Sequence, residues 1–526
     1  MIAATFKIWP NLTLLSIIYL YICSPYNKFQ AMKKSIFLVA ITLIFNLTLS
    51  SFNLSAQESF KIVRGKSDTV YTPVHYIVGV APGGSQIFVN DLPSKQYKTG
   101  SFGSELRLVP GDNSVRVRVI TNGNENIENF VVYYKLLVPV TVPADTVPYT
   151  GRVVVTREGA YMNYGAGQDR LGGAKINYLA EGIRMELLDS AQALYKVRLS
   201  ENSYAFIPKS LVNHEPAGTK PPFSLTSSWS VSNAGNTDIV RVALEKRLPY
   251  TFFKELEPNR IVIDIHGAAC NTNWITQYLN LKMVDYVDYD QIAPDVFRVY
   301  IYLKDEYCWG YKVDYSGTSL VVTVKHTPAP AYKGTLAGLT IGVDAGHGGP
   351  KSHGAVSPSG VREKDLNLAM TYMLRAELEK RGAKVVLSRP DDNDVAMSDR
   401  IKIFANANVD MMVSVHCNAG GNPLRPMGTS TYYKHIEYRE LAKTVLERLT
   451  ELDVNNFGLI GNFNFSLNSP TYWPNILVET MFMSSLPDEE LISDPLFQRM
   501  MMNKTVKGLE DYMKKVKSSL KKGAKR

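Results

Sequence analysis

Cysteine is scarce in this sequence, with four residues among 526, and only three of them follow position 56. This number is too small for a disulfide framework, so the fold must rely on hydrophobic cores. Cys270 and Cys308 fall in one segment and are candidates for a pair, whereas Cys417 stands alone beside His416. At this length a single core is not expected, and we predict roughly three or four domains.

The apolar run near the start of the chain is too short for a membrane anchor. Ile36–Leu49 falls short of the ~20 residues that a spanning helix needs. Lys33 and Lys34 precede this run and small residues follow it, as in a secretory signal peptide. We predict a signal peptide over residues 1–56 with Met32 as the true start, no stable membrane span after cleavage, and a periplasmic or secreted mature protein.

Acidic residues are missing from both ends of the chain. Residues 1–56 carry four lysines, and Lys514–Arg526 carries seven positive charges. Without these charges the formal net charge of +9 falls to −2 for the body of the chain. The basicity therefore belongs to the ends, which argues against nucleic acid as a partner and predicts a solvated basic tail over residues 517–526.

Short strands with partial alternation fill residues 57–145. Turn signals separate them at Pro82-Gly83-Gly84 and at Pro110-Gly111-Asp112-Asn113. The pattern predicts a small β-sandwich. Together with the motif Gly79-Val-Ala-Pro-Gly-Gly, it resembles bacterial immunoglobulin-like modules.

Two further β-rich segments follow a linker at residues 138–150. Leu171-Gly-Gly-Ala-Lys, within residues 150–215, resembles part of a bacterial SH3-like barrel. Strands such as Arg260-Ile-Val-Ile-Asp-Ile make residues 222–327 similar to AMIN-type modules.

Beyond a Pro/Ala-rich linker the pattern changes to apolar strands that alternate with amphipathic helices. The predicted strands cover residues 340–344, 383–388, 411–415 and 475–479, and the predicted helices cover residues 364–380, 437–452 and 495–515. This alternation predicts an α/β domain over residues 336–516, with a mostly parallel sheet flanked by helices. The whole chain is thus expected to be multidomain, with three mainly-β modules ahead of an α/β domain.

Polar side chains gather where the carboxyl ends of these strands meet, which is where open α/β sheets bind ligands. His347 follows the first strand, His416 closes the third, and Glu363 begins the long helix. Two neutral imidazoles and one carboxylate are a common catalytic zinc shell that leaves one position open for water. We therefore predict that these three residues bind Zn2+.

A metal-dependent hydrolase also needs a group that moves a proton between water and the leaving atom. Glu479 closes the fourth strand and is the candidate for this role. Asp344 is placed to orient a ligand, and Asn418 is a second candidate on the substrate side.

Three other residues of this domain, two histidines and a cysteine, have side chains that can bind a metal. His353 is an alternative ligand because it lies near His347 in the sequence, while His435 is expected at the surface without a partner. A thiol at Cys417 beside zinc is a possible ligand or oxidation-sensitive switch. Strand alternation points it away from His416, which favours a buried structural cysteine.

Several motifs in this domain occur in a family-specific order. They are Asp344-Ala-Gly-His-Gly-Gly, Glu363-Lys364-Asp365-Leu-Asn-Leu, Ser414-Val-His-Cys-Asn-Ala and Ile476-Leu-Val-Glu. In these motifs the chain resembles the zinc-dependent N-acetylmuramoyl-L-alanine amidases. The resemblance implies zinc at His347, Glu363 and His416, catalysis by Glu479, and cleavage of the amide between N-acetylmuramic acid and L-alanine in peptidoglycan.

The resemblance implies a role in cell-wall turnover or daughter-cell separation, and it leaves open a regulatory activator protein as a partner. A non-catalytic peptidoglycan-binding protein and a zinc peptidase acting on the stem peptide are the alternatives. The chain departs from the family at Met481, where a glycine is usual, and we expect this side chain to narrow the floor of the site. Residues 455–474 are expected to be an irregular, substrate-facing or gating loop.

Overall fold

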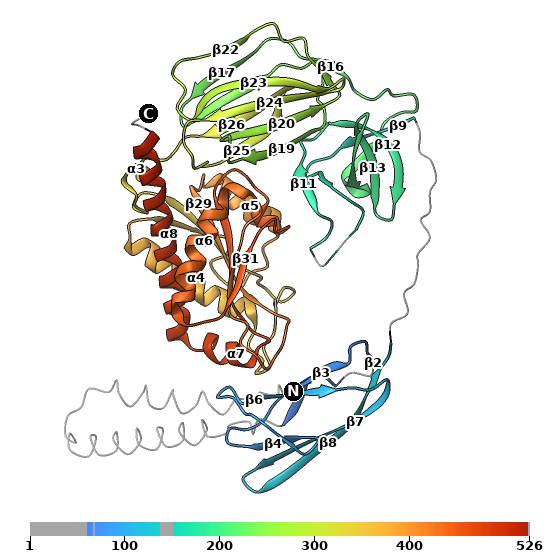
Figure 1. Cartoon of the computed structure of the whole chain (residues 1–526), viewed down its shortest axis with the longest axis vertical. Helices are drawn as coiled ribbons and strands as arrows, with labels where there is room; N and C mark the ends of the chain where they lie inside the picture. Colours follow the sequence, from blue (N-terminus) through green and yellow to red (C-terminus); the bar gives the residue numbers. More distant parts are fainter. Residues whose placement is uncertain (1–59, 67–68, 137–150, 168, 170, 524–526) are drawn as a thin grey trace, which may run out of the picture. The chain divides into compact units, whose positions relative to one another are not determined.

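The structure of the protein is a computed structural model, drawn in Figure 1. The predicted signal peptide and the linker of residues 138–150 lie outside the residues that the structure describes. Those described are residues 60–66, 69–136, 151–167, 169 and 171–523.

The first module is the β-sandwich predicted from the turn pattern. One sheet contains β1 (Lys61–Arg64), β3 (Val74–Val80) and β6 (Ser101–Arg107). The other sheet has the order β2 (Thr69–Val70), β8 (Asn124–Tyr134), β7 (Gly111–Thr121), β4 (Gln86–Val89) and β5 (Leu92–Ser94). Ile77 and Phe102 from the first sheet share a core with Val117 from the second, so the two sheets pack face to face.

The second module is a single antiparallel sheet of seven strands. Their order is β11 (Lys175–Tyr178), β10 (Tyr161–Asn163), β14 (Ser203–Pro208), β13 (Leu194–Ser200), β12 (Arg184–Ala191), β9 (Arg152–Thr156) and β15 (Val212–His214), with the short helix η1 (Lys209–Leu211) before β15. The SH3-like assignment of this sheet stays a prediction.

The third module, the predicted AMIN-type segment, contains two larger sheets. The first has the order β22 (Ile275–Gln277), β17 (Trp229–Ala234), β18 (Thr237–Val242), β26 (Ser319–Lys325) and β25 (Tyr311–Ser316). The second has the order β19 (Tyr250–Glu255), β20 (Arg260–His266), β24 (Val296–Leu303) and β23 (Val284–Ala293). A small pair, β16 (Ser224–Leu225) and β21 (Ala268–Ala269), completes it. The second and third modules share one hydrophobic core. Cys270 is exposed, Cys308 is buried and both are free, so the two candidates do not form a disulfide in the structure.

The last domain is built on a six-stranded, mostly parallel sheet. Its order is β28 (Lys384–Leu387), β27 (Thr340–Ala345), β29 (Met411–Asn418), β32 (Asn475–Phe482), β30 (Thr429–Tyr432) and β31 (Asn456–Ile460). The first four strands run parallel, as predicted, and β30 runs antiparallel to β32. The expectation of an irregular segment at residues 455–474 is partly wrong, because β31 pairs there with β30.

Helices cover both faces of this sheet. On one face, α4 (Glu363–Lys380) and α6 (Arg439–Leu449) both contact α8 (Pro495–Gly523), and Figure 1 shows the three helices together. On the other face lie α5 (Met397–Asn406) and η4 (Ser466–Asn468). The remaining helices are α3 (Ala329–Lys333), α7 (Leu486–Ile492), η2 (Ile436–Tyr438) and η3 (Thr450–Leu452).

The side chains of strand β29 alternate between the two helix-covered faces of the sheet. Val413, Val415 and Cys417 pack toward α4, α6 and α8, whereas Met412 packs toward α5. His416 therefore faces the α5 side of the sheet.

The prediction of a solvated tail beginning at residue 517 is wrong for the described residues, because α8 continues to Gly523 through lysine-rich turns. Lysine is a good helix former, and Val516 and Leu520 still pack against the core. Among the described residues we find no helix with the length and apolar character needed to cross a membrane.

Candidate metal centre

His347 lies on the turn that directly follows β27. Its φ of 61° is in the left-handed region, which a non-glycine residue adopts only when its surroundings hold it there. The preceding Gly346 is required by close approach, since a Cβ at this position would lie 2.3 Å from the His416 ring. The missing side chain at Gly346 leaves room for the His416 ring. The imidazoles of His347 and His416 therefore lie close together, with ring centroids 5.1 Å apart.

Arg400 of α5 holds this turn in place. Its guanidinium donates to the carbonyl oxygens of Ala345 and His347, both at 2.6 Å, and to Asp344 Oδ1 at 2.7 Å. Ser414 donates to the other Asp344 oxygen at 2.6 Å. Burial raises the pKa of Asp344, but Arg400, His416 and the hydroxyls of Ser388 and Ser414 together outweigh it, so the net pKa lies below the ordinary value. Asp344 therefore supports the turn through Arg400.

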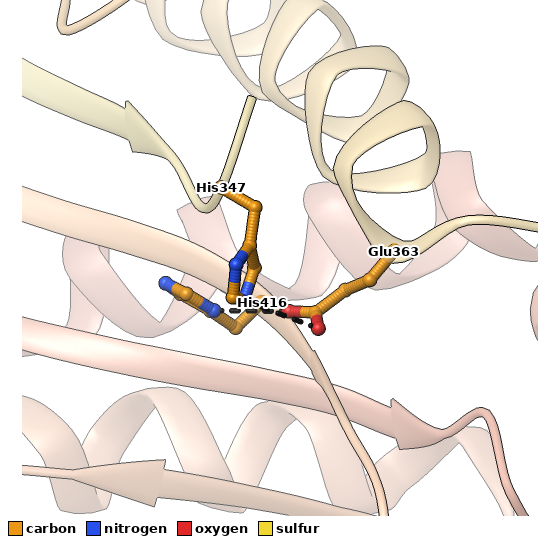
Figure 2. Close-up of side chains that lie close together, drawn as sticks. All are labelled: His347, Glu363 and His416. Atoms are coloured by element: carbon orange, nitrogen blue, oxygen red, sulfur yellow. Dashed lines mark hydrogen bonds and ion pairs between the residues drawn. The ribbon is translucent and has the colours of Figure 1, made fainter. Parts of the chain in front are cut away.

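Glu363 is the first residue of α4 and points at both histidines (Figure 2). Its Oε2 lies 3.2 Å from His347 Nε2, and its Oε1 lies 3.0 Å from His416 Nδ1. The Ala355 N–H donates to Oε2 at 2.8 Å, and the Asn367 amide donates to Oε1 at 3.1 Å. These donors fix the carboxylate between the two rings.

The charges in this cluster favour an ionised carboxylate. Burial raises the pKa of Glu363, but hydrogen bonds with His347 and His416 outweigh it, so the net pKa lies well below the ordinary value. For His416, burial lowers the pKa, but the Glu363 hydrogen bond and the charges of Glu363, Glu479 and Asp344 together raise it above the ordinary value.

The three side chains have the geometry and chemistry of a metal shell. One ligand atom from each of His347, Glu363 and His416 lies within 4.8 Å of the others. Imidazole and carboxylate are the ligands that zinc takes in catalytic sites, and three protein ligands leave a position for water. The predicted ligand set is therefore brought together and fits zinc.

Glu479 lies beside this cluster on the neighbouring strand. It is the register partner of His416 in the parallel pair β29 and β32, so the two side chains project from the same face. Its side chain is half-buried, whereas the rest of β32 is buried. The position fits a proton-transfer group next to a metal.

Two predicted neighbours lie outside the ligand group. Asn418 donates to the Tyr432 hydroxyl at 3.1 Å and thereby ties β29 to β30. Cys417 is buried with its Sγ 3.2 Å from Thr480 Oγ1, as expected for a structural cysteine. A register shift after Glu479 turns Met481 into the helix-covered core, so the expectation that Met481 narrows the site floor is wrong.

The two competing histidines do not join the cluster. His353 is absent from the group of ligating atoms. The expectation for His435 is wrong, because its Nε2 lies 2.9 Å from the Ser469 carbonyl oxygen and burial lowers its pKa to about 4. Ser469 comes from a segment distant in sequence, so the residues around His435 gave no sign of this contact.

Sequence reasoning missed several residues that support the site. Arg389 donates to the carbonyl oxygens of Ala345 and Gly346 at 2.9 and 3.1 Å, and so helps Arg400 to hold the turn. Phe465 packs edge-on against the His416 ring, with centroids 5.6 Å apart. A lone arginine or phenylalanine in a loop carries no sequence signal for such a role.

The sheet, the ligand cluster and the adjacent glutamate together define a metal-site α/β hydrolase. The family model of N-acetylmuramoyl-L-alanine amidase matches residues 341–511, and that of the AMIN domain matches residues 229–324. The chain therefore belongs to the N-acetylmuramoyl-L-alanine amidase family through its C-terminal domain, with an AMIN domain ahead of it.

Individual proteins show the same likeness. The uncharacterized protein YqiI of Bacillus subtilis (strain 168) is 30% identical over 182 residues, 34% of this chain and 86% of that protein. The N-acetylmuramoyl-L-alanine amidase AmiC of Neisseria meningitidis serogroup B is 27% identical over 383 residues, 56% of this chain and 90% of that protein. The N-acetylmuramoyl-L-alanine amidase structure from Clostridium difficile 630 is 31% identical, with a TM-score of 0.32, and covers 34% of this chain and 98% of that one.

Proposed function

We propose that residues 336–516 form a zinc-dependent amidase that cleaves the bond between N-acetylmuramic acid and L-alanine in peptidoglycan. The observation that carries this proposal is the cluster of His347, Glu363 and His416 with Glu479 on the adjacent strand. Membership in the amidase family supplies the identity of the bond.

The residues of the site have separate roles in metal binding, proton transfer and support of the His347 turn. His347, Glu363 and His416 would hold the zinc ion, which supplies Lewis-acid chemistry to water and to the scissile carbonyl. Glu479 takes the proton from the attacking water and returns it to the leaving amide nitrogen. Arg400 and Asp344 keep the His347 turn in its strained conformation.

We further propose that the mature chain acts in the cell envelope, either periplasmic or secreted, in wall turnover or daughter-cell separation. Peptidoglycan lies outside the cytoplasmic membrane, and the predicted signal peptide would deliver the enzyme to it.

Digestion of purified sacculi by the zinc-loaded chain tests the bond specificity. The expected products, identified by mass, are free stem peptides and intact glycan strands. Fragments of stem peptide would indicate a peptidase, and no release would indicate a binding protein. Turnover by the purified chain alone would show that no activator protein is required.

The role of Glu479 is tested separately by Glu479→Gln. The variant should bind zinc with unchanged stoichiometry and lose activity by about 10²–10⁴-fold, the usual contribution of general acid–base catalysis. Turnover within a few-fold of the unchanged chain would remove Glu479 from the mechanism.

A further inference from the structure

Two lysines from different modules meet at one asparagine side chain. Lys434 donates from Nζ to Asn464 Oδ1 and to Ser469 Oγ, both at 3.4 Å. Lys175, the first residue of β11, donates its backbone N–H to the same Asn464 oxygen at 3.3 Å. The Asn464 amide in turn donates to the Gly173 carbonyl oxygen at 2.6 Å. These contacts join the second module to the amidase domain.

This meeting point is connected to the metal centre on two sides. Phe465, which follows Asn464, packs against the His416 ring. On the other side, Tyr432 lies two residues before Lys434 and accepts a hydrogen bond from Asn418. Since one residue of extended peptide spans about 3.5 Å, a substrate peptide that leaves the metal centre on this side reaches the lysines within a few residues.

The two positive charges have no anionic partner in contact with them among the described residues. The Lys434 ammonium contacts only neutral oxygens, and Lys175 Nζ lies over the Tyr161 ring, 5.0 Å from its centroid. Burial, with a smaller effect from Lys175, lowers the pKa of Lys434 to about 8. Burial also lowers the pKa of Lys175, and the more distant Asp169 opposes it. A half-buried ammonium group without an anionic partner is destabilising until an anion joins it.

We propose that Lys175 and Lys434 form a subsite for a free carboxylate of the peptidoglycan stem peptide. The proposal rests on the amidase function proposed above and names a part of the substrate that the enzyme selects. The stem peptide carries free carboxylates beyond its first residue, and ammonium groups bind carboxylates through charge-assisted hydrogen bonds. The second module thus contributes a residue to substrate recognition, and the enzyme prefers peptides whose carboxylates are not amidated.

The test compares two muramoyl-peptide substrates that differ only in whether the stem-peptide carboxylates are free or amidated. For the zinc-loaded full chain we expect a KM about tenfold lower for the free form, because one charge-assisted contact contributes about that factor. Lys175→Met and Lys434→Met should each reduce this difference to less than about threefold, with kcat within about twofold. Lys175→Met is the cleaner variant, since the bond to Asn464 comes from the backbone and is retained.

Two further variants separate charge from structure. Lys434→Arg keeps the positive charge and should preserve most of the preference. Lys443→Met removes a half-buried lysine of α6 that pairs with Glu447 on the same helix, and it should change nothing.

The proposal is overturned if the unchanged chain uses both substrates equally. It is also overturned if the methionine variants raise KM equally for both substrates, because the lysines would then only support the structure. If the unchanged chain turns over neither substrate, the amidase proposal fails. Calorimetric binding of the free and amidated stem peptides then decides the subsite by itself, with tighter binding of the free form expected and equal affinities refuting it.

Discussion

Two buried glutamates of the amidase domain lie in opposite surroundings. Glu363 is 4% exposed and accepts hydrogen bonds from two backbone N–H groups, one amide and two imidazoles. Glu437 on η2 is 7% exposed, and its Oε1 has no hydrogen-bond partner among the described residues. Burial raises the pKa of Glu437 to about 7, although Lys254 of the AMIN module opposes this.

The comparison shows that donors, and not depth alone, decide whether a buried carboxyl group stays ionised. At Glu363 the donors outweigh burial, so the group is an anion that can ligate a cation. At Glu437 burial prevails, so the group is neutral below about pH 7 and behaves as a polar core residue. The fold therefore concentrates donors at the carboxyl ends of its strands, where the chemistry needs a charge.

The largest expected effect follows from removing the charge at the first of these glutamates. Glu363→Gln should lower zinc affinity by more than about a hundredfold and abolish amidase activity, since even indirect supports of a metal site cost up to that factor. Zinc titration against a competing chelator measures the affinity.

Glu379→Gln is the matched control, because it makes the same substitution at the exposed end of the same helix. It should leave zinc binding unchanged. If Glu363→Gln bound zinc as tightly as the control, the Glu363 carboxylate would not be a ligand. The difference in ionisation between Glu363 and Glu437 would then have no role in metal binding.

The next effect concerns the cation that keeps Asp344 ionised. Arg400→Met leaves a fully buried carboxylate without its partner, and breaking a buried pair in this way typically costs about 3–5 kcal/mol. Urea unfolding measures the loss of stability, and zinc affinity should fall as well because the His347 turn is released. Arg375→Met, in an exposed pair of α4, should cost less than about 1 kcal/mol. Equal losses in both variants would show that Asp344 does not depend on Arg400.

The grouping of His347, Glu363 and His416 was predictable from the sequence, because motifs place the two histidines at strand ends and Glu363 at the start of a helix. Their role as ligands, and the proton-transfer role of Glu479, stay predictions. The role of Arg400 was not predictable, because its hydrogen bonds reach the turn after β27, which is distant in sequence. Strand β30 was missed for another reason. Thr429, Ser430 and Thr431 are fully buried, and a polar strand of this kind has the composition of a loop. The bond between Lys175 and Asn464 depends on how two modules pack, which no local pattern encodes.

A smaller effect comes from the pH dependence at Glu437. In the folded chain the pKa is about 7, against an ordinary value of 4.5. Between these values only the folded state holds the proton, so stability is fully present below about pH 4.5 and is lost as the pH rises through 7. The loss totals about 3 kcal/mol at a rate of about 1.4 kcal/mol per pH unit.

Glu437→Gln cannot ionise and should remove this loss. The measurement is the difference in unfolding free energy between pH 5 and pH 7.5, compared with Glu440→Gln in a surface pair with Lys515. The control should keep the full pH dependence of the unchanged chain. If Glu437→Gln keeps it too, Glu437 is ionised in the folded state and the two glutamates do not differ.

The smallest effect concerns the thiol that lies near each glutamate. Burial, and after it Glu437, raise the pKa of Cys308 to about 12, and burial followed by Glu363 raises the pKa of Cys417. Since the thiolate is the reactive form, a disulfide reagent should modify exposed Cys270 at least about a hundredfold faster than either buried thiol. Cys270→Ser should remove the fast phase, and urea should expose the other two together. Rapid modification of Cys417 in the folded chain would contradict the expected order of reaction. A reactive thiol next to His416 would mean that water reaches the metal centre. Solvation, and not the hydrogen-bond donors, would then explain why Glu363 stays charged.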